Sequence, residues 1–547
     1  MQCVLIGHKH VNEVQTVAQV FFPGERFNAV KVQYRPHTYL EAGYTIESWL
    51  EEEAAYASVY KDGEFVAGHK WPFCCDDIKP GKYLTERRVI MLALYHALQK
   101  AVGAYTPWGA LTGIRPSKLV REWLEAGHSG EDITKTLTEV ICCHKEKARL
   151  ALAVAHAENR LTPPPGTIGL YVSIPFCPTR CVYCSFNTSH KPADTDLQRR
   201  YCDALAGECF EKARQARAMG AAISSIYIGG GTPTVLSEVL LEKVLEAVGE
   251  AFNIAEASER LQSPRSALAR RFSAPPAEDR ACLENLNNAL PLPLSIEYTV
   301  EAGRPDTLTP GKLALMRRYG VNRIAVNPQT LNDHTLAAIG RGHTAADFFA
   351  AFEMTRNAGF ACINTDLIVG LPGETPDDTR RTMEELARLS PENITVHTLA
   401  VKRASRLNEL IRLEHDSQKT PGQSRDEAVN VEAMLRTASK ACAEMGLSPY
   451  YLYRQKNMVG LFENVGYSLP GHECSYNIGM MAEVQTILGI GAGAVSKFVE
   501  RSRALPSEAT GACGRKPHLE GDKITREFNA KNPEIYIERR NCHDSGT

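Results

Sequence analysis

Residues 177–184 read CPTRCVYC and place three cysteines, Cys177, Cys181 and Cys184, in the spacing CxxxCxxC. They follow a run of strand-forming residues, so the motif is expected in a loop at a strand end. Three thiolates this close together can bind three irons of one [4Fe–4S] cubane. A structural zinc site normally uses four ligands in two pairs, and the sequence contains no second CxxC pair. We therefore expect these cysteines to hold a cluster whose fourth iron is open.

An open iron gives the cluster a place for a ligand. S-adenosylmethionine (SAM) can bind there through its amine and carboxylate. An electron from the reduced cluster then breaks an S–C bond of the sulfonium and releases a 5′-deoxyadenosyl radical. In such a reaction the cofactors carry the chemistry, while the protein positions them and excludes water.

A second motif follows one predicted strand later. Residues 225–234 read SIYIGGGTPT, with three glycines at the end of the strand. Glycines allow the backbone to approach a ligand closely, so the backbone carbonyls of this turn are candidates to accept from the SAM ammonium group. Taken alone, the same residues are also typical of an ordinary strand–helix turn.

Around these motifs, between residues 167 and 402, strand and helix patterns alternate. Strands are predicted at 168–174, 225–228, 294–300, 323–326, 362–369 and 394–399. Helices are predicted at 196–218, 237–252, 310–319, 345–358 and 376–389. Six β/α units indicate an α/β fold with a parallel sheet, an incomplete (β/α)6 TIM-like barrel. The chemistry of such barrels lies where the strands end.

The remaining sequence predicts two flanking regions and an insertion. Residues 1–165 contain strand-like and helical runs and are interpreted as an N-terminal α+β extension. Residues 254–293 lack apolar periodicity and are interpreted as an insertion in the barrel region, 167–402. Residues 403–547 are expected to form a mainly helical C-terminal region that completes the active site.

Composition excludes several classes of protein. The 547-residue chain has 62 Lys and Arg against 64 Asp and Glu, a net charge of −2, so no nucleic-acid partner is expected. No apolar stretch is long enough to span a membrane and no signal peptide is recognisable, which predicts a cytoplasmic protein. The adjacent pairs Cys74-Cys75 and Cys142-Cys143 are interpreted as ordinary thiols.

Several motifs together resemble the radical SAM superfamily and, within it, the oxygen-independent coproporphyrinogen III oxidase (coproporphyrinogen dehydrogenase) family. These motifs are IPFC at 174–177, GGGTPT at 229–234, IGRGHT at 339–344 and NTDLIVGLPG at 364–373. Three more resemble the long variant of that family, which has an N-terminal extension. They are ALTGIRP at 110–116, VHTLA at 396–400 and NVGY at 464–467.

The resemblance implies a set of SAM contacts: Tyr171, Tyr183, Gly230, Gly231, Thr232, Glu301, Gln329, Arg341, Asp366 and Ala400. The residue chemistry agrees, because a carboxylate such as Asp366 suits ribose hydroxyls and Arg341 suits a carboxylate. Each residue also has an ordinary structural interpretation, as an ion pair, a helix cap or a turn acid.

The implied reaction is oxidative decarboxylation of two propionates of coproporphyrinogen III, which gives protoporphyrinogen IX in haem biosynthesis. Two SAM molecules would be consumed, and a flavodoxin- or ferredoxin-like donor would reduce the cluster. The run CSFN at 184–187 is similar to a haem-chaperone branch that does not oxidise coproporphyrinogen. A radical SAM methyltransferase is a third alternative. Possible tetrapyrrole contacts, each also interpretable as packing, are His343, His397, His472, Tyr450, Tyr451 and Tyr453.

Overall fold

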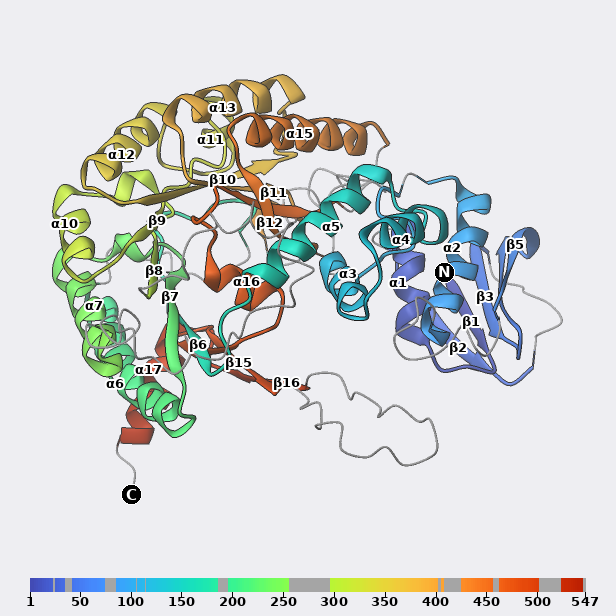
Figure 1. The fold of residues 1–547 in the computed structure, drawn as a ribbon, viewed down its shortest axis with the longest axis horizontal. Coiled ribbons are helices and arrows are strands. Elements are labelled where there is room, and N and C mark those ends of the chain that lie inside the picture. Colours follow the sequence, from blue (N-terminus) through green and yellow to red (C-terminus); the bar gives the residue numbers. More distant parts are fainter. Residues whose placement is uncertain are drawn as a thin grey trace, which may run out of the picture.

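Two β-sheets organise the chain in the computed structural model (Figure 1). The structure describes residues 1–22, 25–34, 42–73, 85–104, 106–113, 115–184, 195–254, 296–401, 405–407, 425–455, 462–500 and 523–544. Residues 255–293 of the predicted insertion, together with Cys74, Cys75, Ile114 and Phe186, lie outside the described residues.

The larger sheet is built around six parallel strands that lie side by side in chain order. They are β6 (Thr167–Ile174), β7 (Ala222–Gly230), β8 (Glu297–Glu301), β9 (Arg323–Ala325), β10 (Cys362–Val369) and β11 (Asn393–Thr398). The helices between them are α6 (Thr195–Ala218), α7 (Glu238–Phe252), α10 (Pro310–Arg318), α11 (Asp333–Ala338), α12 (Ala345–Asn357) and α13 (Pro376–Leu389), with 3₁₀ turns at Pro233–Val235 and Pro305–Thr307. In the described part of the chain, the first and last strands of this sheet do not pair with each other, so the sheet does not close. The predicted incomplete barrel is therefore confirmed.

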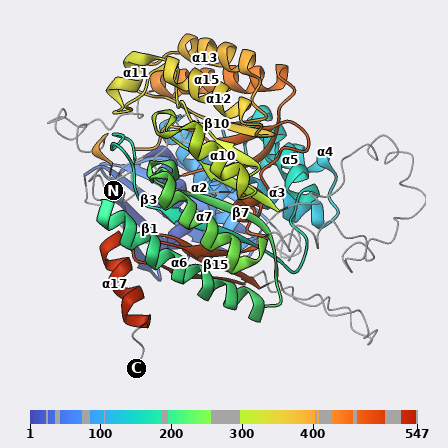
Figure 2. The same ribbon diagram turned by 90° about the vertical axis from the view of Figure 1, so that its left-hand side faces the viewer.

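Alternate residues of the parallel strands face two different environments. On β6, Leu170, Val172 and Ile174 are fully buried in the main apolar core. The helices that cover this convex side are visible in Figures 1 and 2. The other face carries polar residues, including Tyr171 on β6 and Asp366 on β10. Parallel strands in α/β proteins are normally apolar on both faces, so a polar concave face marks a place for a ligand.

The C-terminal region contributes strands to both edges of this sheet. Its strands are β12 (Ser448–Tyr453), β13 (Asn464–Ser468), β14 (Thr486–Ile490), β15 (Val495–Glu500) and β16 (Lys523–Phe528). Its helices are α15 (Arg425–Glu444), α16 (Ser475–Met481) and α17 (Pro533–Asp544). β13 pairs antiparallel with β11, and β14 pairs parallel with β6. The prediction of a mainly helical region thus omitted five strands, because short strands are defined by their neighbours more than by their own sequence.

The segment 472–476 covers the amino-terminal end of the parallel strands. The Arg323 side chain donates to the carbonyl of His472, and Asn393 Nδ2 donates to the same oxygen over 3.2 Å. The Glu297 carboxylate accepts from the backbone N–H groups of Ser475 (2.7 Å) and Tyr476 (3.0 Å), at the start of α16. These contacts close the end of the barrel opposite the cysteine loop.

The N-terminal region forms a separate five-stranded sheet in the order β2 (Asn28–Val32), β1 (Gln2–Ile6), β3 (Tyr44–Leu50), β4 (Ala54–Lys61) and β5 (Glu64–Pro72). The helices of this region are α1 (Val11–Phe21), α2 (Glu86–Val102), α3 (Pro116–Glu125), α4 (Gly130–Lys135) and α5 (Lys145–Arg160), with a π turn at Thr136–Val140. No helix in the described ranges is both long and apolar enough to cross a membrane.

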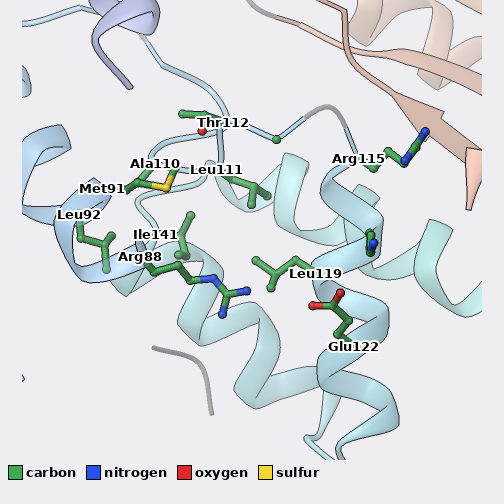
Figure 3. Close-up of a pocket in the computed structure, with 12 residues that line it drawn as sticks. Arg88, Met91, Leu92, Ala110, Leu111, Thr112, Arg115, Leu119, Glu122 and Ile141 are labelled. Atoms are coloured by element: carbon green, nitrogen blue, oxygen red, sulfur yellow. The ribbon is translucent and has the colours of Figure 1, made fainter. Parts of the chain in front are cut away.

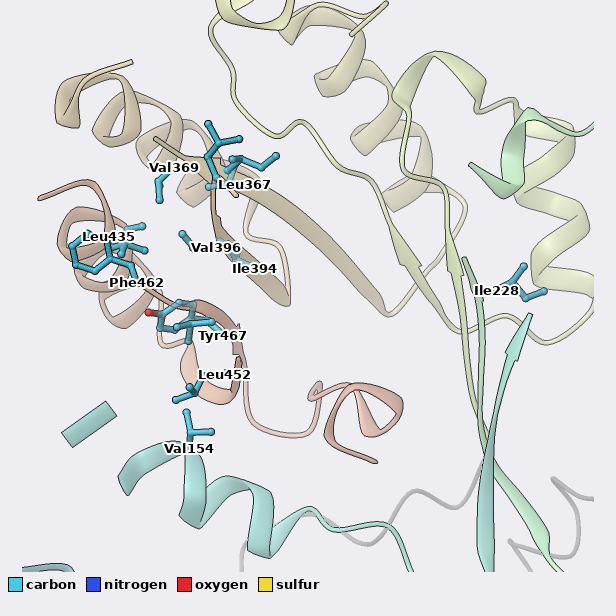
Figure 4. Close-up of a cluster of buried hydrophobic side chains, with 14 of the residues drawn as sticks. Val154, Ile228, Leu367, Val369, Ile394, Val396, Leu435, Leu452, Phe462 and Tyr467 are labelled. Carbon is cyan, nitrogen blue, oxygen red and sulfur yellow. The ribbon is translucent and has the colours of Figure 1, made fainter. Parts of the chain in front are cut away.

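Buried contacts join this region to the barrel. Trp108 Nε1 donates to the Glu463 carboxylate over 2.8 Å, and Arg454 Nη1 donates to the carbonyl of Leu111 over 2.6 Å. Figure 4 shows Val154 of α5 beside Leu452 of β12 in the same apolar cluster. The ALTGIRP signature therefore lies where the N-terminal region meets the barrel.

Candidate active site

The three cysteines of the motif lie in the loop that follows β6, and each is partly buried. Cys177 Sγ lies 3.5 Å from Thr232 Oγ1. Burial raises the pKa of Cys177 to about 11; the Thr232 hydrogen bond lowers it, and the neighbouring Cys184 and Cys181 raise it further. Thiols that oppose one another's ionisation in this way fit a cationic iron cluster, which would stabilise all three thiolates.

A cubane and a single metal ion require different arrangements of ligands. Within the described ranges, no three His, Cys, Asp or Glu side chains converge closely enough to bind one ion. In a cubane each thiolate binds a different iron, so the sulfurs stand farther apart than the ligands of one ion. The loop therefore fits a cluster by the number and type of its donors.

The glycine turn after β7 packs directly against the cysteine loop. The backbone N–H of Gly231 donates to Ile174 O over 2.8 Å, and that of Thr232 donates to Phe176 O over 2.7 Å. A Cβ atom at Gly231 would lie 2.4 Å from Phe176 O and 3.0 Å from Cys177 Sγ. Gly230 has a φ of 109°, which side chains rarely tolerate. The glycines are thus required for the close approach of the two loops.

Two carboxylates face each other beside this turn. Glu301 ends β8, and Asp366 lies on β10, where Asn327 Nδ2 and Asn364 Nδ2 donate to it over 2.9 and 2.8 Å. Burial and the negative charge of Asp366 raise the pKa of Glu301 to about 8. Burial alone would raise the pKa of Asp366, but hydrogen bonding and charge from His397 hold it below its ordinary value.

Near neutral pH the pair therefore contains one carboxylate and one carboxylic acid. A protonated Glu301 can donate to a hydroxyl or carboxylate, whereas Asp366 accepts hydrogen bonds. Because Glu301 is close to ionising, a cationic ligand group would convert it to a second acceptor. The pair is suited to a ligand that carries both hydroxyl and ammonium groups.

Gln329 and Arg341 hold buried polar atoms without partners. Gln329 has a φ of 69°, and its backbone bridges β10 by bonds to Asp366 O (3.0 Å) and from the Ile368 N–H (2.9 Å). Arg341 donates to Gly303 O over 2.8 Å and to Tyr183 OH over 3.4 Å. Among the described residues, Gln329 Oε1 and Arg341 Nε have no hydrogen-bond partner. Buried polar atoms left open in this way, beside strained backbone, fit a polar ligand such as SAM.

Tyr171 lies deeper in the barrel than the other predicted SAM contacts. Its ring stacks on that of Tyr227 with centroids 6.3 Å apart, and Tyr227 stacks on Tyr476 at 4.7 Å. Tyr227 could have been found from sequence, because it lies two residues before Gly229 and therefore on the same strand face. Tyr476 carries no such signal, since it comes from the distant helix α16. These rings form an aromatic wall below the glycine turn.

The remaining candidates are spread over the molecule. His397 Nε2 lies 3.8 Å from Asp366, and Tyr451 OH lies 3.3 Å from Thr395 Oγ1, so both belong to the concave face. His472 lies at the opposite end of the barrel, where its carbonyl receives Arg323. His343 is buried, and neither ring nitrogen has a hydrogen-bond partner in the part of the chain that the structure describes. Ala400 follows β11 by two residues and is partly buried.

Comparison with known proteins decides the family. A model of the radical SAM superfamily matches residues 171–386. The oxygen-independent coproporphyrinogen-III oxidase-like protein HemZ of Bacillus subtilis is 36% identical over 461 residues, which span 83% of this chain and 78% of that protein. The chain belongs to the HemZ-like family of radical SAM proteins.

Other relatives differ in their described roles. The heme chaperone HemW of Bacillus subtilis is 32% identical over 235 residues, or 42% of this chain and 50% of that protein. Among solved structures, the coproporphyrinogen III oxidase HemN of Escherichia coli, described as a radical SAM enzyme, aligns with a TM-score of 0.45 and 20% identity over 72% of each chain. The relatives found by sequence thus include an oxidase-like protein and a heme chaperone.

A separate pocket of about 230 Å³ lies in the N-terminal region of this radical SAM protein (Figure 3). The signature residues Leu111, Thr112 and Arg115 line it together with Arg88 of α2 and Glu122 of α3. Arg115 also pairs with Glu483 of the C-terminal region. None of the predicted SAM contacts lines this pocket, so it does not extend the radical SAM site.

Proposed function

We propose that this protein decarboxylates the propionate side chains of coproporphyrinogen III oxidatively, to the vinyl groups of protoporphyrinogen IX. A [4Fe–4S] cluster on Cys177, Cys181 and Cys184 and SAM beside it are the cofactors of this proposal. The observation that carries it is the gathering of the cysteine loop, the glycine turn and the two acids Glu301 and Asp366 at the carboxyl ends of the strands. Membership in a family with an oxidase-like relative supports the tetrapyrrole substrate.

The chain's own residues would bind, orient and shield. When bound, the reduced cluster and SAM supply a hydrogen-abstracting radical. Gly230, Gly231 and Thr232 would bind the methionine part of SAM through backbone groups. Asp366 would accept from the ribose hydroxyls, and Glu301 would accept from the ammonium group once ionised. Arg341 Nε and Gln329 Oε1 are the open donor and acceptor that the rest of the ligand would satisfy.

The concave face below these residues would receive the tetrapyrrole. Tyr171, Tyr227 and Tyr476 provide stacked rings, an apolar surface against which the pyrrole rings of the substrate could pack. The segment 472–476 closes the barrel beneath them, which would keep water from the reacting carbon.

The proposal has three further components. A flavodoxin- or ferredoxin-like protein would supply the electron. Two SAM molecules would be consumed for each product, because two propionates react. A cytoplasmic location goes with the proposal, since a reducing compartment preserves the free thiols of the cluster loop.

The test is an anaerobic assay of the reconstituted full chain with SAM, a reductant and coproporphyrinogen III. We expect protoporphyrinogen IX together with 5′-deoxyadenosine. Cys181→Ala should abolish both products, whereas Cys542→Ala, at an exposed cysteine of α17, should abolish neither. Deoxyadenosine formed without any porphyrin product would refute the substrate and leave the cofactors in place.

A haem chaperone is the second candidate, favoured by the match to the heme chaperone HemW and by the CSFN run at 184–187. It predicts that haem binds tightly to the reconstituted protein and that coproporphyrinogen III is recovered unchanged. Spectroscopic titration with haem, run beside the product assay, separates the two functions. Methylated product with S-adenosylhomocysteine would instead indicate a methyltransferase.

A further inference from the structure

Arg304 reaches the cysteine loop from the segment that follows strand β8, two strands away from β6 in the sheet. It is 3% exposed, and its Nε and Nη2 donate to the two carboxylate oxygens of Asp306 over 3.1 and 3.2 Å. Its Nη1 donates over 2.8 Å to the hydroxyl of Thr179, which lies between Cys177 and Cys181. The Arg304 guanidinium thus binds the first half of the CxxxCxxC loop through one nitrogen, while its other two nitrogens are fixed by Asp306.

The IGRGHT segment supports the same loop from a second direction. Thr179 Oγ1 donates to Gly340 O over 3.0 Å, and the backbone N–H of Val182 donates to Ile339 O over 3.0 Å. A Cβ atom at Gly342 would lie 3.0 Å from Arg304 Nη2, and one at Gly340 would lie 3.2 Å from Arg180 O. The two glycines of this motif are therefore explained by the close approach of the segment to Arg304 and to the cysteine loop.

Two buried arginines consequently hold the two halves of the loop. Arg304 contacts Thr179 in the first half, and Arg341 contacts Tyr183 in the second half. Arg341 also donates to the carbonyl of Gly303, the residue before Arg304, so the backbone at Gly303 links the two arginines. Removing either cation would leave these acceptors without their donor.

The charge of Arg304 also lies beside the proposed cluster, because its guanidinium bonds to Thr179, which is two residues from both Cys177 and Cys181. A reduced cluster carries one more negative charge than an oxidised one. A buried cation nearby stabilises the reduced form and makes its potential less negative.

We propose that Arg304 is a positioning residue of the cluster, which fixes the Cys177–Cys181 half of the loop through Thr179 and eases the one-electron reduction of the cluster by its charge. This inference rests on the proposed cluster at the three cysteines. It assigns no contact between Arg304 and SAM or substrate.

The experiment compares variants of the anaerobically reconstituted full chain in three measurements. These are the rate of iron loss to a chelator, the electron paramagnetic resonance spectrum after dithionite reduction, and the midpoint potential from a redox titration. Arg304→Gln removes both the guanidinium contacts and the charge, and Arg304→Lys keeps the charge alone. Thr179→Val leaves Arg304 in place and removes its link to the loop, together with the bond from Thr179 to Gly340. Arg199→Gln, at an exposed arginine of α6, is the matched control.

Arg304→Gln should lose iron roughly tenfold faster than wild type and show a more negative midpoint potential. Arg304→Lys should lose iron as fast, with a potential close to wild type, because lysine keeps the charge and cannot make the guanidinium contacts. Thr179→Val should lose iron faster with an unchanged potential, and Arg199→Gln should behave as wild type.

Wild-type iron loss in Arg304→Lys and Thr179→Val would overturn the positioning role, and would do so even if Arg304→Gln failed to fold. An unchanged potential in a folded Arg304→Gln would overturn the electrostatic role. If wild type itself assembled no cluster, the proposed function and this inference would both fall, whereas unchanged variants beside a cluster-bearing wild type would overturn this inference alone.

Discussion

Glu297 and Glu301 occupy the two ends of the same strand, β8, and face the same concave side of the sheet. Glu297 accepts from two backbone N–H groups of α16 and lies 4.0 Å from Arg323. Glu301 instead faces Asp366, and its pKa is raised to about 8. The charge of Glu297 is thus balanced by donors of the protein itself, whereas Glu301 is buried beside a second carboxylate. The two residues share their type and their strand face, so the difference between them comes from the residues around each one.

The largest effect should come from a change at the carboxyl ends of the barrel strands, where Glu301 and the cysteine loop lie. Cys181→Ala removes a thiolate of the proposed cluster, so reductive cleavage of SAM should become undetectable and the iron content should fall. The structure at the amino-terminal end of the strands should be unaffected, because Glu297 and the 472–476 segment lie at the opposite end of the barrel from the cysteine loop. Cleavage product and bound iron are the measurements, and far-ultraviolet circular dichroism checks the fold. A variant that retained iron and cleavage would remove the basis of the comparison.

The titration of Glu301 should appear in the pH dependence of stability. Its pKa is about 8 in the folded chain and 4.5 in the unfolded chain, so the folded state keeps a proton that the unfolded state releases. The stability that it contributes is complete below about pH 4.5 and is lost as the pH rises to about 8. Relative to Glu301→Gln, the free energy of unfolding of wild type should fall by roughly 2–4 kcal/mol across this range. Urea unfolding of the ligand-free chain at several pH values measures it, and a pH-independent difference would contradict it.

Glu297→Gln should act on stability without acting on chemistry. The amide has one oxygen in place of the two carboxylate oxygens, so it cannot accept from both α16 N–H groups. We therefore expect a loss of about 1–3 kcal/mol in the free energy of unfolding. SAM cleavage by the folded variant at saturating SAM should stay near wild type. Glu384→Gln, at an exposed residue of α13, is the control. A large fall in cleavage with normal stability would show that the two ends of β8 are not separate in function.

The smallest effect should come from the contact between the N-terminal region and the barrel. Trp108→Phe removes the indole N–H that Glu463 accepts, and we expect destabilisation of about 1–2 kcal/mol. Thermal unfolding followed by tryptophan fluorescence of the remaining residues, beside circular dichroism, gives the change. Cleavage of SAM should persist at the wild-type rate. A slower rate of SAM cleavage in this variant would show that the N-terminal region also contributes to the reaction.

The six barrel strands were predictable because their signals are local. The strand expected at 362–369 is β10 itself, and the helix expected at 376–389 is α13. Apolar runs between amphipathic helices specify such units without reference to distant residues. The same logic predicts that chemistry gathers at strand ends, where the structure places Glu301 and the glycine turn.

Contacts between distant segments were not predictable from the sequence pattern. Arg304 reads as an ordinary turn residue before Pro305, and only the fold brings it to Thr179. The strand β14 pairs with β6 from the far end of the chain, and Tyr476 reaches the concave face from α16. In each case the partner is selected by tertiary packing, which propensity and periodicity do not encode.

The pairing of β14 with β6 also has a consequence for synthesis on the ribosome. β6, which leads into the cysteine loop, ends at Ile174, and its partner strand begins only at Thr486. At about 5–20 residues per second, translation leaves that edge of β6 without its strand for on the order of 15–60 seconds. Throughout this interval the nascent chain presents an open strand edge next to the thiols of the proposed cluster, so it needs protection from aggregation until β14 emerges.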